Sequence, residues 1–468
     1  MAEHSMENLI FYDTETSGIN KDYSQIFQCG SIRTNASFDV LETHNTHSQP
    51  LPWVIPQPRA MLTNKKTFVF NANISHYEMM LDIHRQWRQW TIDEPAIFVT
   101  YNGHSFDEEL IRRQFYWNLL DIYLTNTNGN GRLDMLLMMH ALACFAPSAL
   151  KIPLFEGGPN ISLKLEDIAR ENGLDTDDAH DAIADCEFMV DLFRKIQAQN
   201  PDFVAYFISA STKPGIQEHL QQDGFFGFAE VFKRQKFQWP VVPCGSDLER
   251  PNYLALFDLG HDPDDIFDLD TSDIYKMIQS SAKDNPIKKC QINKTIPLCP
   301  SHLIEDKNIF DLDFDVLEER ARKVKSNLDF QQTVSQALTD RIFNSKEPNT
   351  IEEAIYAGGF PSPSDKSLMD DFHRFASAEE RIKIVRNIKD DRFRLFAERL
   401  VCQMYPNDAP EDMRTRYQEL IASRISEDGP WGSIVKASTE IEKLLGESAS
   451  DEDQSILKDT QAYLNSLR

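Results

Sequence analysis

The first 200 residues alternate between short apolar strands and amphipathic helices, and this alternation restricts the fold more than any other feature of the sequence. The strand patterns cover residues 8–13, 25–33, 38–43 and 97–101. The helical patterns cover residues 105–120, 134–145, 165–172 and 179–199. Strands and helices that alternate along a chain are typical of a mixed α/β domain, so we expect one in residues 1–200.

The pattern changes near Pro201 and again after the Gly-Pro-Ser cluster at residues 358–364. Strand residues separated by turns dominate from Gly224 to Phe257, and residues 316–345 return to a helical pattern, which indicates a small β-barrel with helices. The last third contains helical patterns, at residues 366–374, 378–387, 390–404, 410–426, 433–445 and 451–466. We therefore expect three domains, covering residues 1–200, 201–350 and 351–468.

The chain lacks the sequence features of membrane and secreted proteins. It has no run of about 18 apolar residues, and its first residues lack the basic start and apolar run of a signal peptide. The seven cysteines are scattered and never form a Cys-x-x-Cys pair, which argues against a disulfide framework and against a zinc site. These features predict a protein of the reducing cytoplasm without a membrane partner.

The formal net charge of −26, taken alone, argues against a nucleic-acid partner, because phosphate binding favours basic surfaces. Two interpretations stay open. The acidity can serve solubility alone, or carboxylates can gather at metal sites while basic residues line a groove. Net charge does not choose between them, because binding depends on local fields.

Carboxylates recur at the ends of expected strands and inside expected helices. Asp13 and Glu15 lie two residues apart on a strand, so their side chains point to the same face. Asp107 follows the 97–101 strand and opens the next helix, and Asp185 interrupts an otherwise apolar helix face. Two-metal hydrolysis of a phosphodiester needs several carboxylates at one point, because hard cations such as Mg²⁺ prefer oxygen ligands.

His180, at the start of the last of these helices, supplies a base, since an imidazole with a pKa of about 6.5 can take a proton from metal-bound water. Simpler interpretations exist for the same residues. Asp13 and Glu15 also fit a solvated strand end, and His180 fits a surface cap. Asp107 and Asp181 fit plain stabilisation of a helix dipole, which we prefer for Asp181.

The order Asp-x-Glu, then strand–Asn-x-x-x-Phe-Asp–helix, then His-Asp-Ala-x-x-Asp resembles the DEDDh exonuclease superfamily, which has the ribonuclease-H-like fold. The resemblance assigns the acids and the histidine to Asp13, Glu15, Asp107, Asp185 and His180. It implies that the acids hold two Mg²⁺ ions, for which Mn²⁺ can substitute, and that the histidine is the general base. It also implies 3′→5′ hydrolysis that releases 5′-mononucleotides.

Further segments resemble the bacterial exodeoxyribonuclease I family. They are Ile55–Pro58, Leu62–Thr63, Arg112–Tyr116, the run from Leu163 to Asp185 and, more patchily, Asp223–Gly227 and Ile355–Phe360. The layout of that family implies an α/β ribonuclease-H-like exonuclease domain, an SH3-like β-barrel domain with helices and an all-α C-terminal domain. It also implies single-stranded DNA as the substrate, a role in DNA repair and recombination, a monomer, and binding to the C-terminal tail of single-strand-binding protein.

The family contacts substrate DNA at positions that correspond here to Glu15, Arg112, Tyr123 and Lys164. The sequence departs from the family at three positions, where an aromatic residue and two arginines are expected and where Thr127, His140 and Lys164 stand. Lysine keeps the charge at position 164 but lacks the planar fork of arginine. The expected path of the DNA is therefore less defined than the metal site.

The run from Phe232 to Trp239 interleaves aromatic and basic residues within an expected strand from Glu230 to Trp239. Contact with DNA and a half-buried edge strand explain it equally well. Two other functions are considered for the whole chain: RNA trimming or proofreading by a DEDDh exonuclease, and a non-catalytic nucleic-acid-binding scaffold. The length of the chain disfavours the first, and the complete set of acids and histidine disfavours the second.

Overall fold

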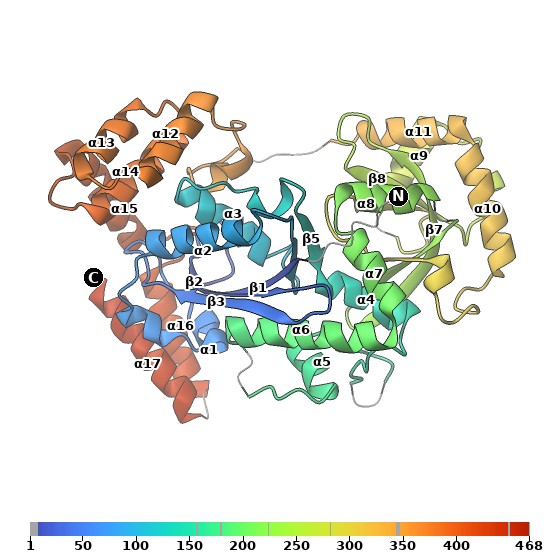
Figure 1. Cartoon of the computed structure of the whole chain (residues 1–468), viewed down its shortest axis with the longest axis horizontal. Helices are drawn as coiled ribbons and strands as arrows, with labels where there is room; N and C mark the ends of the chain where they lie inside the picture. The colour runs from blue at the N-terminus through green and yellow to red at the C-terminus, as the bar shows by residue number, and fades with distance from the viewer. Residues whose placement is uncertain are drawn as a thin grey trace.

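The computed structural model describes residues 8–155, 158–177, 180–222, 224–280, 282–342, 347–447 and 450–467. A first sheet lies at the centre of the molecule, a second sheet lies on one side of it, and the C-terminal helices lie on the other (Figure 1). The mixed α/β class and the helical C-terminal part expected from the sequence are both confirmed.

The first sheet has five strands in the order β3-β2-β1-β4-β5. They are β1 (Leu9–Thr16), β2 (Ile26–Thr34), β3 (Val40–His47), β4 (Ile97–Thr100) and β5 (Gly131–Asp134). The first three strands form an antiparallel meander, and β1, β4 and β5 run parallel to one another. The parallel strands bring the carboxyl ends of β1, β4 and β5 to one edge of the sheet.

Helices cover both faces of this sheet, so the central strand β1 is buried on both sides, as its continuous apolar run requires. The helices of this part are α1 (Pro58–Asn64), α2 (His76–Trp90), α3 (Asp107–Trp117), α4 (Met135–Phe145), α5 (Leu165–Glu171) and α6 (Ala182–Gln199). Leu9 and Phe11 of β1 pack with α4 and α6. Ile10 and Tyr12 pack with α2 and α3 on the opposite face.

The strands and helices expected in this part are present with shifts of a few residues at their ends. Helix α2 was not predicted, although the sequence contains its start signal. The Ser75 hydroxyl accepts a hydrogen bond from the backbone N–H of Glu78, and the Glu78 carboxylate accepts one from the backbone N–H of Ser75, which is a capping box.

The second sheet is antiparallel, with the order β10-β6-β7-β8-β9. Its strands are β6 (Phe226–Phe232), β7 (Gln235–Ser246), β8 (Tyr253–Asp258), β9 (Ile287–Gln291) and β10 (Leu298–Pro300). The helices before, within and after it are α7 (Pro201–Ser209), α8 (Lys213–Gln222), α9 (Thr271–Gln279), α10 (Phe314–Ser326) and α11 (Leu328–Thr339). Helices α9, α10 and α11 cover one face, while Phe226 and Val241 on the other face join the core that contains α4 and α6.

The single strand expected from Glu230 to Trp239 is wrong. The chain turns back at Lys233 and Arg234, which both have positive φ angles, of 48° and 68°. Such angles at two central residues make a tight hairpin between β6 and β7. The register pairs Phe232 with Gln235 and Val231 with Lys236, so the run from Phe232 to Trp239 forms the end of β6, a tight turn and the start of β7 rather than one strand.

The C-terminal helices form two groups, and both pack on the first part of the chain. They are α12 (Pro363–Arg374), α13 (Ala378–Asn387), α14 (Asp391–Met404), α15 (Glu411–Ser426), α16 (Ile434–Glu447) and α17 (Asp451–Ser466). Helices α12 to α15 share a core with Tyr116 and Trp117 of α3. Helices α16 and α17 pack around Ile55 and Met61 near α1 (Figure 1). Within the described ranges, no helix combines the length and the apolar character that crossing a membrane requires.

Candidate metal and catalytic site

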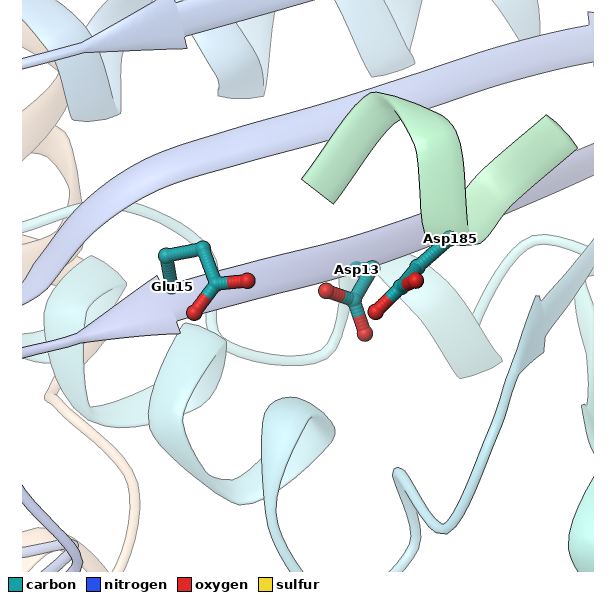
Figure 2. A group of neighbouring side chains, drawn as sticks. All are labelled: Asp13, Glu15 and Asp185. Atoms are coloured by element: carbon teal, nitrogen blue, oxygen red, sulfur yellow. The ribbon is translucent and has the colours of Figure 1, made fainter. Parts of the chain in front are cut away.

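Three carboxylates from two elements converge at the carboxyl end of β1. Asp13 and Glu15 project from β1, and Asp185 projects from the first turn of α6 (Figure 2). One oxygen atom of each carboxylate lies within 4.8 Å of the others. The even spacing along β1 puts Asp13 and Glu15 on the α6 face, the same face as Leu9 and Phe11.

A glycine allows α6 to approach β1 this closely. Gly30 of β2 is paired with Asp13 across the antiparallel ladder. A Cβ atom at position 30 would lie 2.6 Å from the backbone of Ala182 and Ile183, so only glycine leaves room for the start of α6. No local sequence pattern predicts this contact, because Gly30 and Ala182 are far apart in the chain.

Asp107 reaches the site from the other face of the sheet. It begins α3 and is 5% exposed, and Thr14 Oγ1 donates a hydrogen bond of 2.5 Å to its Oδ1. Thr14 points to the α2 and α3 face because it lies between Asp13 and Glu15 on the strand. The carboxylate of Asp107 is outside the cluster of three, but it raises the pKa of Asp13 and of Glu15.

All four carboxyl groups hold protons more tightly than usual. Burial, followed by repulsion from neighbouring carboxylates, raises the pKa of Asp13 and of Glu15 well above the ordinary values. Burial also raises the pKa of Asp107 and of Asp185 to about 6, although the hydrogen bond from Thr14 opposes the shift of Asp107. A divalent cation among buried carboxylate oxygens removes this repulsion, so the donor set fits a hard divalent metal ion.

His180 lies in the segment that leads into α6, next to Ala179, which is outside the described residues. It is exposed and has a positive φ angle of 68°, and its Nε2 atom lies 3.8 Å from Glu166 Oε2 on α5. Its backbone N–H lowers the pKa of Asp185 through a hydrogen bond. The backbone of His180 therefore contacts the Asp185 carboxylate, whereas its imidazole lies beside Glu166.

Lys66 is a buried cation at this site that the sequence reasoning missed. Its Nζ atom lies 2.7 Å from Asp181 Oδ2 and lowers the pKa of Glu15. Asp181 also accepts hydrogen bonds from the Gln28 side chain, at 3.1 Å, and from the Ile183 backbone N–H, at 3.1 Å. Burial opposes ionisation of Asp181, but the hydrogen bond from Lys66 brings its pKa below the ordinary value. Asp181 therefore caps α6, as expected, and also ties it to two other segments.

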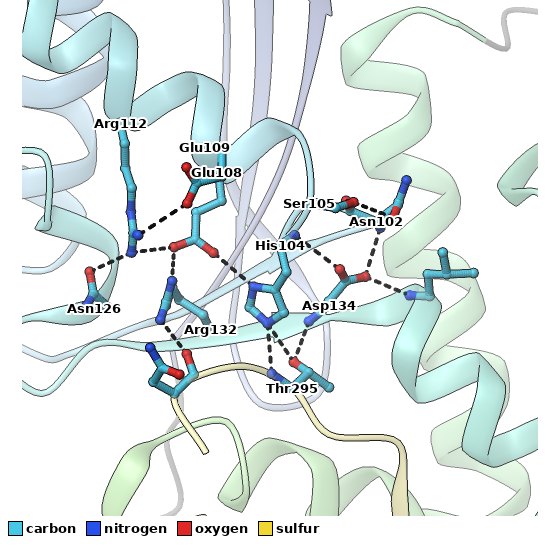
Figure 3. Close-up of polar contacts among 12 residues, drawn as sticks. Asn102, His104, Ser105, Glu108, Glu109, Arg112, Asn126, Arg132, Asp134 and Thr295 are labelled. Carbon is cyan, nitrogen blue, oxygen red and sulfur yellow. Dashed lines mark hydrogen bonds and ion pairs between the residues drawn. The ribbon is translucent and has the colours of Figure 1, made fainter. Parts of the chain in front are cut away.

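Hydrogen bonds to Asp134, the last residue of β5, fix the turn that leads into Asp107 (Figure 3). Asp134 accepts hydrogen bonds from the backbone N–H groups of Asn102, at 2.8 Å, and His104, at 3.1 Å. Its own backbone N–H donates to Thr295 Oγ1, at 2.8 Å. Thr295 belongs to the segment between β9 and β10, so the second sheet region braces the start of α3.

His104 connects the same brace to a buried ion-pair network (Figure 3). Its Nε2 atom accepts the Thr295 backbone N–H at 2.9 Å, so Nδ1 carries the proton and donates to Glu108 Oε2 at 2.9 Å. Burial lowers the pKa of His104 to about 3, which keeps this tautomer neutral. Glu108 in turn pairs with Arg112, at 2.6 Å, and with Arg132.

Comparison with known proteins gives two family matches along this chain. Residues 10–193 match the exonuclease family, and residues 349–467 match the exonuclease I C-terminal domain. The chain belongs to the exonuclease I family.

Curated relatives agree with this membership in the exonuclease I family. Exodeoxyribonuclease I of Buchnera aphidicola (subspecies Schizaphis graminum) is 26% identical over 399 residues, covering 83% of this chain and 81% of the relative. Exodeoxyribonuclease I of Escherichia coli is 25% identical over 386 residues, covering 77% and 78%.

Two solved structures have the same fold over nearly the whole chain. Exonuclease I from Methylocaldum szegediense superposes with a TM-score of 0.81 at 21% identity, covering 98% of this chain and 99% of the other. Exonuclease I of E. coli in complex with a dA16 oligonucleotide superposes with a TM-score of 0.82 at 19% identity, covering 99% and 100%.

The residues of this exonuclease I family member that we expected to contact DNA occupy different environments. Arg112 is only 9% exposed and is engaged by Glu108 and by the Asn126 side chain at 3.2 Å. Tyr123 is half-buried, with the Arg112 guanidinium 5.3 Å from its ring centre. Lys164 is exposed at the start of α5. Lys164 is therefore accessible and Tyr123 partly so, whereas the Arg112 guanidinium is engaged by other residues of the protein.

A cavity of about 740 Å³ lies beside Tyr123, between the end of α3 and the C-terminal helices. Phe360 lines it and is 80% exposed, and its ring centre lies 5.7 Å from that of Tyr123. Arg392 donates to the carbonyl groups of Ala357 and Gly359, which fixes the turn that presents Phe360. Phe360 ends the segment Ile355–Phe360 that resembles the exodeoxyribonuclease I family, but no role was predicted for it from the sequence.

Thr127 and His140, the other two positions where the sequence was expected to depart from the family, also have structural roles. Thr127 lines the same cavity, and its Oγ1 donates to the Tyr123 carbonyl at 2.9 Å. His140 on α4 accepts the backbone N–H of Val231 from the β6–β7 hairpin at 3.3 Å. Burial lowers the pKa of His140 to about 4, so His140 is neutral where α4 packs on the β6–β7 hairpin.

Proposed function

We propose that the protein is a 3′→5′ exonuclease that degrades single-stranded DNA to 5′-mononucleotides with two Mg²⁺ ions, for which Mn²⁺ can substitute. The observation that carries this proposal is the convergence of Asp13, Glu15 and Asp185 within 4.8 Å, with Asp107 alongside. The relatives named exodeoxyribonuclease I and the E. coli structure with a bound oligonucleotide support the choice of substrate.

Each residue has a defined task in the proposed reaction. Asp13, Glu15, Asp107 and Asp185 would hold the cations, which supply charge neutralisation at the phosphate and activation of water. His180 accepts the proton of the attacking water at its imidazole, since it is exposed and next to the cap of α6. Glu15 also contacts the terminal nucleotide, and Lys164 and Tyr123 bind the strand by charge and by stacking.

The proposal extends to the organisation and the setting of the chain. We assign residues 1–200 to a ribonuclease-H-like exonuclease domain, 201–350 to an SH3-like domain and 351–468 to the helical domain. The five-stranded antiparallel sheet with helices on one face supports the second assignment. From the family we further expect a monomer in the cytoplasm that acts in DNA repair and recombination and binds the tail of single-strand-binding protein.

A nuclease assay with end-labelled strands tests the proposal. Single-stranded DNA, duplex DNA and RNA, each labelled at the 5′ or the 3′ end, are incubated with Mg²⁺, with Mn²⁺ or with EDTA. We expect labelled mononucleotide to appear first from 3′-labelled single-stranded DNA, and no product in EDTA. Preferential digestion of RNA would instead favour an RNA-trimming enzyme.

Matched carboxylate variants connect the activity to the site. Asp185→Asn is expected to lower the rate by about a hundredfold or more, because a charged ligand is lost at the reacting centre. Asp202→Asn removes an exposed carboxylate of α7 and should leave the rate unchanged. Full activity of Asp185→Asn would refute the two-metal assignment.

A further inference from the structure

We propose that the tip of the β6–β7 hairpin is a second contact surface for single-stranded DNA, outside the metal site. This surface, called here the hairpin tip, consists of Phe232, Lys233, Arg234 and Lys283. The proposal rests on the proposed function, because it assigns an additional part of the same substrate to the second sheet region.

The hairpin tip presents an aromatic ring to solvent in a cationic setting. Phe232 is 49% exposed at the end of β6, next to the tight turn at Lys233 and Arg234. The Lys233 and Lys283 ammonium groups lie 5.5 Å and 5.2 Å from its ring centre. A large apolar side chain at a hairpin end would gain more by burial, so its exposure needs another reason.

The aromatic surface continues from Phe232 along the same face of the sheet. Lys283 lies over Phe237 as well, 2.7 Å from the ring centre, and Phe237 stacks with Trp239 at 6.2 Å and 13°. Lys288 lies 4.4 Å from the Trp239 ring centre. Rings and cations that alternate along a surface are the usual means of binding single strands without sequence preference, by stacking and by phosphate contacts.

The hairpin tip is fixed beside a segment of the proposed active site. The Arg234 carbonyl accepts the backbone N–H of Ile161 at 2.9 Å, and the Arg234 guanidinium lies 3.6 Å from the Phe155 ring centre. Lys164 follows Ile161 by three residues, which span roughly 10 Å at most. Between them, the Leu163 carbonyl accepts a hydrogen bond from Tyr101, the residue after β4. A strand held at Lys164 can therefore continue onto the hairpin tip.

Charge also favours a polyanionic ligand at this place. The chain has a net charge of −26, yet three of the four residues of the hairpin tip are cationic. Beside the tip, burial lowers the pKa of Lys288, while Asp258, Asp284 and Glu230 oppose that shift. A concentration of cations at one place produces a local field that attracts phosphate, whatever the net charge of the whole chain.

Binding experiments in EDTA test the hairpin tip independently of catalysis. Fluorescein-labelled oligothymidylate of about 30 nucleotides is titrated with wild-type protein, Phe232→Leu and Phe232→Tyr, since one binding fold covers roughly 4–16 nucleotides. Phe232→Leu keeps apolar bulk but loses the flat ring, so we expect about tenfold weaker binding, the effect of losing one stacked base. Phe232→Tyr should bind like the wild type.

The cations of the hairpin tip are tested by salt dependence. The triple variant Lys233→Gln/Arg234→Gln/Lys283→Gln should reduce the slope of log K against log salt by about 2, at roughly 0.7 per lost phosphate contact. The matched control Arg322→Gln/Arg374→Gln/Lys443→Gln removes three exposed cations from α10, α12 and α16 and should keep the wild-type slope.

A small substrate separates this proposal from the proposed function. The p-nitrophenyl ester of thymidine 5′-monophosphate reaches the metal site but has no strand to cover the hairpin tip. All hairpin variants should hydrolyse it at the wild-type rate. If the wild-type protein does not hydrolyse this ester, the proposed function is contradicted. If Phe232→Leu and the triple variant both keep the wild-type affinity for DNA and the wild-type salt slope, the hairpin proposal alone is overturned.

Discussion

The backbone of Ala182, at the start of α6, rests on Gly30, the residue that faces Asp13 across β1 and β2. This contact sets the distance between the helix that carries Asp185 and the strand that carries Asp13 and Glu15. A Cβ atom on Gly30 would meet the Ala182 and Ile183 backbone at 2.6 Å, and backbone has no rotamer with which to move aside.

We therefore predict that Gly30→Ala displaces the start of α6 and lowers kcat on single-stranded DNA by about a hundredfold, the effect of a misplacement of about 1 Å at a reacting centre. Steady-state kinetics at saturating metal measure the change. Gly446→Ala is the matched control, because a Cβ atom there meets nothing within 4 Å on α16. Equal kcat values for the two variants would contradict the prediction.

Lys66→Met is predicted to change metal binding and turnover in opposite directions. Lys66 favours the ionised form of Glu15, so the same cation disfavours a metal ion beside Glu15. Its removal should tighten Mn²⁺ binding several-fold in a calorimetric titration. Turnover at saturating metal should fall by about tenfold, because Asp181 loses the 2.7 Å contact that fixes the start of α6.

The neighbouring Lys65 provides the control for this variant. Lys65 pairs with Glu452 at 2.9 Å on the surface, where both side chains are about half exposed. Exposed ion pairs contribute little, so Lys65→Met should leave both measurements unchanged. Wild-type metal affinity together with wild-type turnover in Lys66→Met would rule out the role given to Lys66.

Thr295→Val is predicted to destabilise the protein by about 1–3 kcal/mol, because it leaves the buried N–H of Asp134 without its acceptor. Urea unfolding measures the difference. Thr333→Val removes a hydroxyl that bonds only to a carbonyl of its own helix, α11, and should stay within about 0.5 kcal/mol of the wild type. The prediction fails if both variants unfold at the same urea concentration.

His84→Phe is predicted to make the protein less sensitive to acid. Burial lowers the pKa of His84 from 6.5 to about 3, so the unfolded chain takes up a proton below pH 6.5 that the folded chain refuses. His84 therefore lowers the unfolding free energy as the pH falls through this window, by up to about 1.4 kcal/mol per pH unit. Substitution by phenylalanine removes this contribution.

Urea unfolding of both proteins at several pH values between about 4 and 8 tests the His84 prediction. At pH 8 the imidazole is neutral in both states, so the difference there reports packing against Phe115 alone. His76 and His104, whose pKa values are also lowered to about 3 by burial, remain in both proteins and cancel. Parallel pH profiles of the two proteins would contradict the assignment.

Short-range sequence patterns predicted most of the secondary structure. The expected C-terminal helix at 378–387 coincides with α13, and the last one, at 451–466, coincides with α17. The strand expected from Glu230 to Trp239 fails because β-propensity continues through Lys233 and Arg234 while their backbone turns. Neither residue favours a positive φ angle by itself, so the hairpin depends on pairing between β6 and β7.

The sequence alone determined which residues can form the site. The spacing of Asp13 and Glu15 sets a common face of β1, and the order of motifs that follows adds Asp107, Asp185 and His180. Tertiary structure decided how these residues meet. Gly30 leaves room for the start of α6, and Thr14 donates a hydrogen bond to Asp107 on the opposite face of the sheet. Lys66 forms an ion pair with Asp181. Periodicity encodes the face of each element, but the contacts between elements join residues far apart in the chain, such as Gln28 and Asp181, which are 153 positions apart, and only packing fixes them.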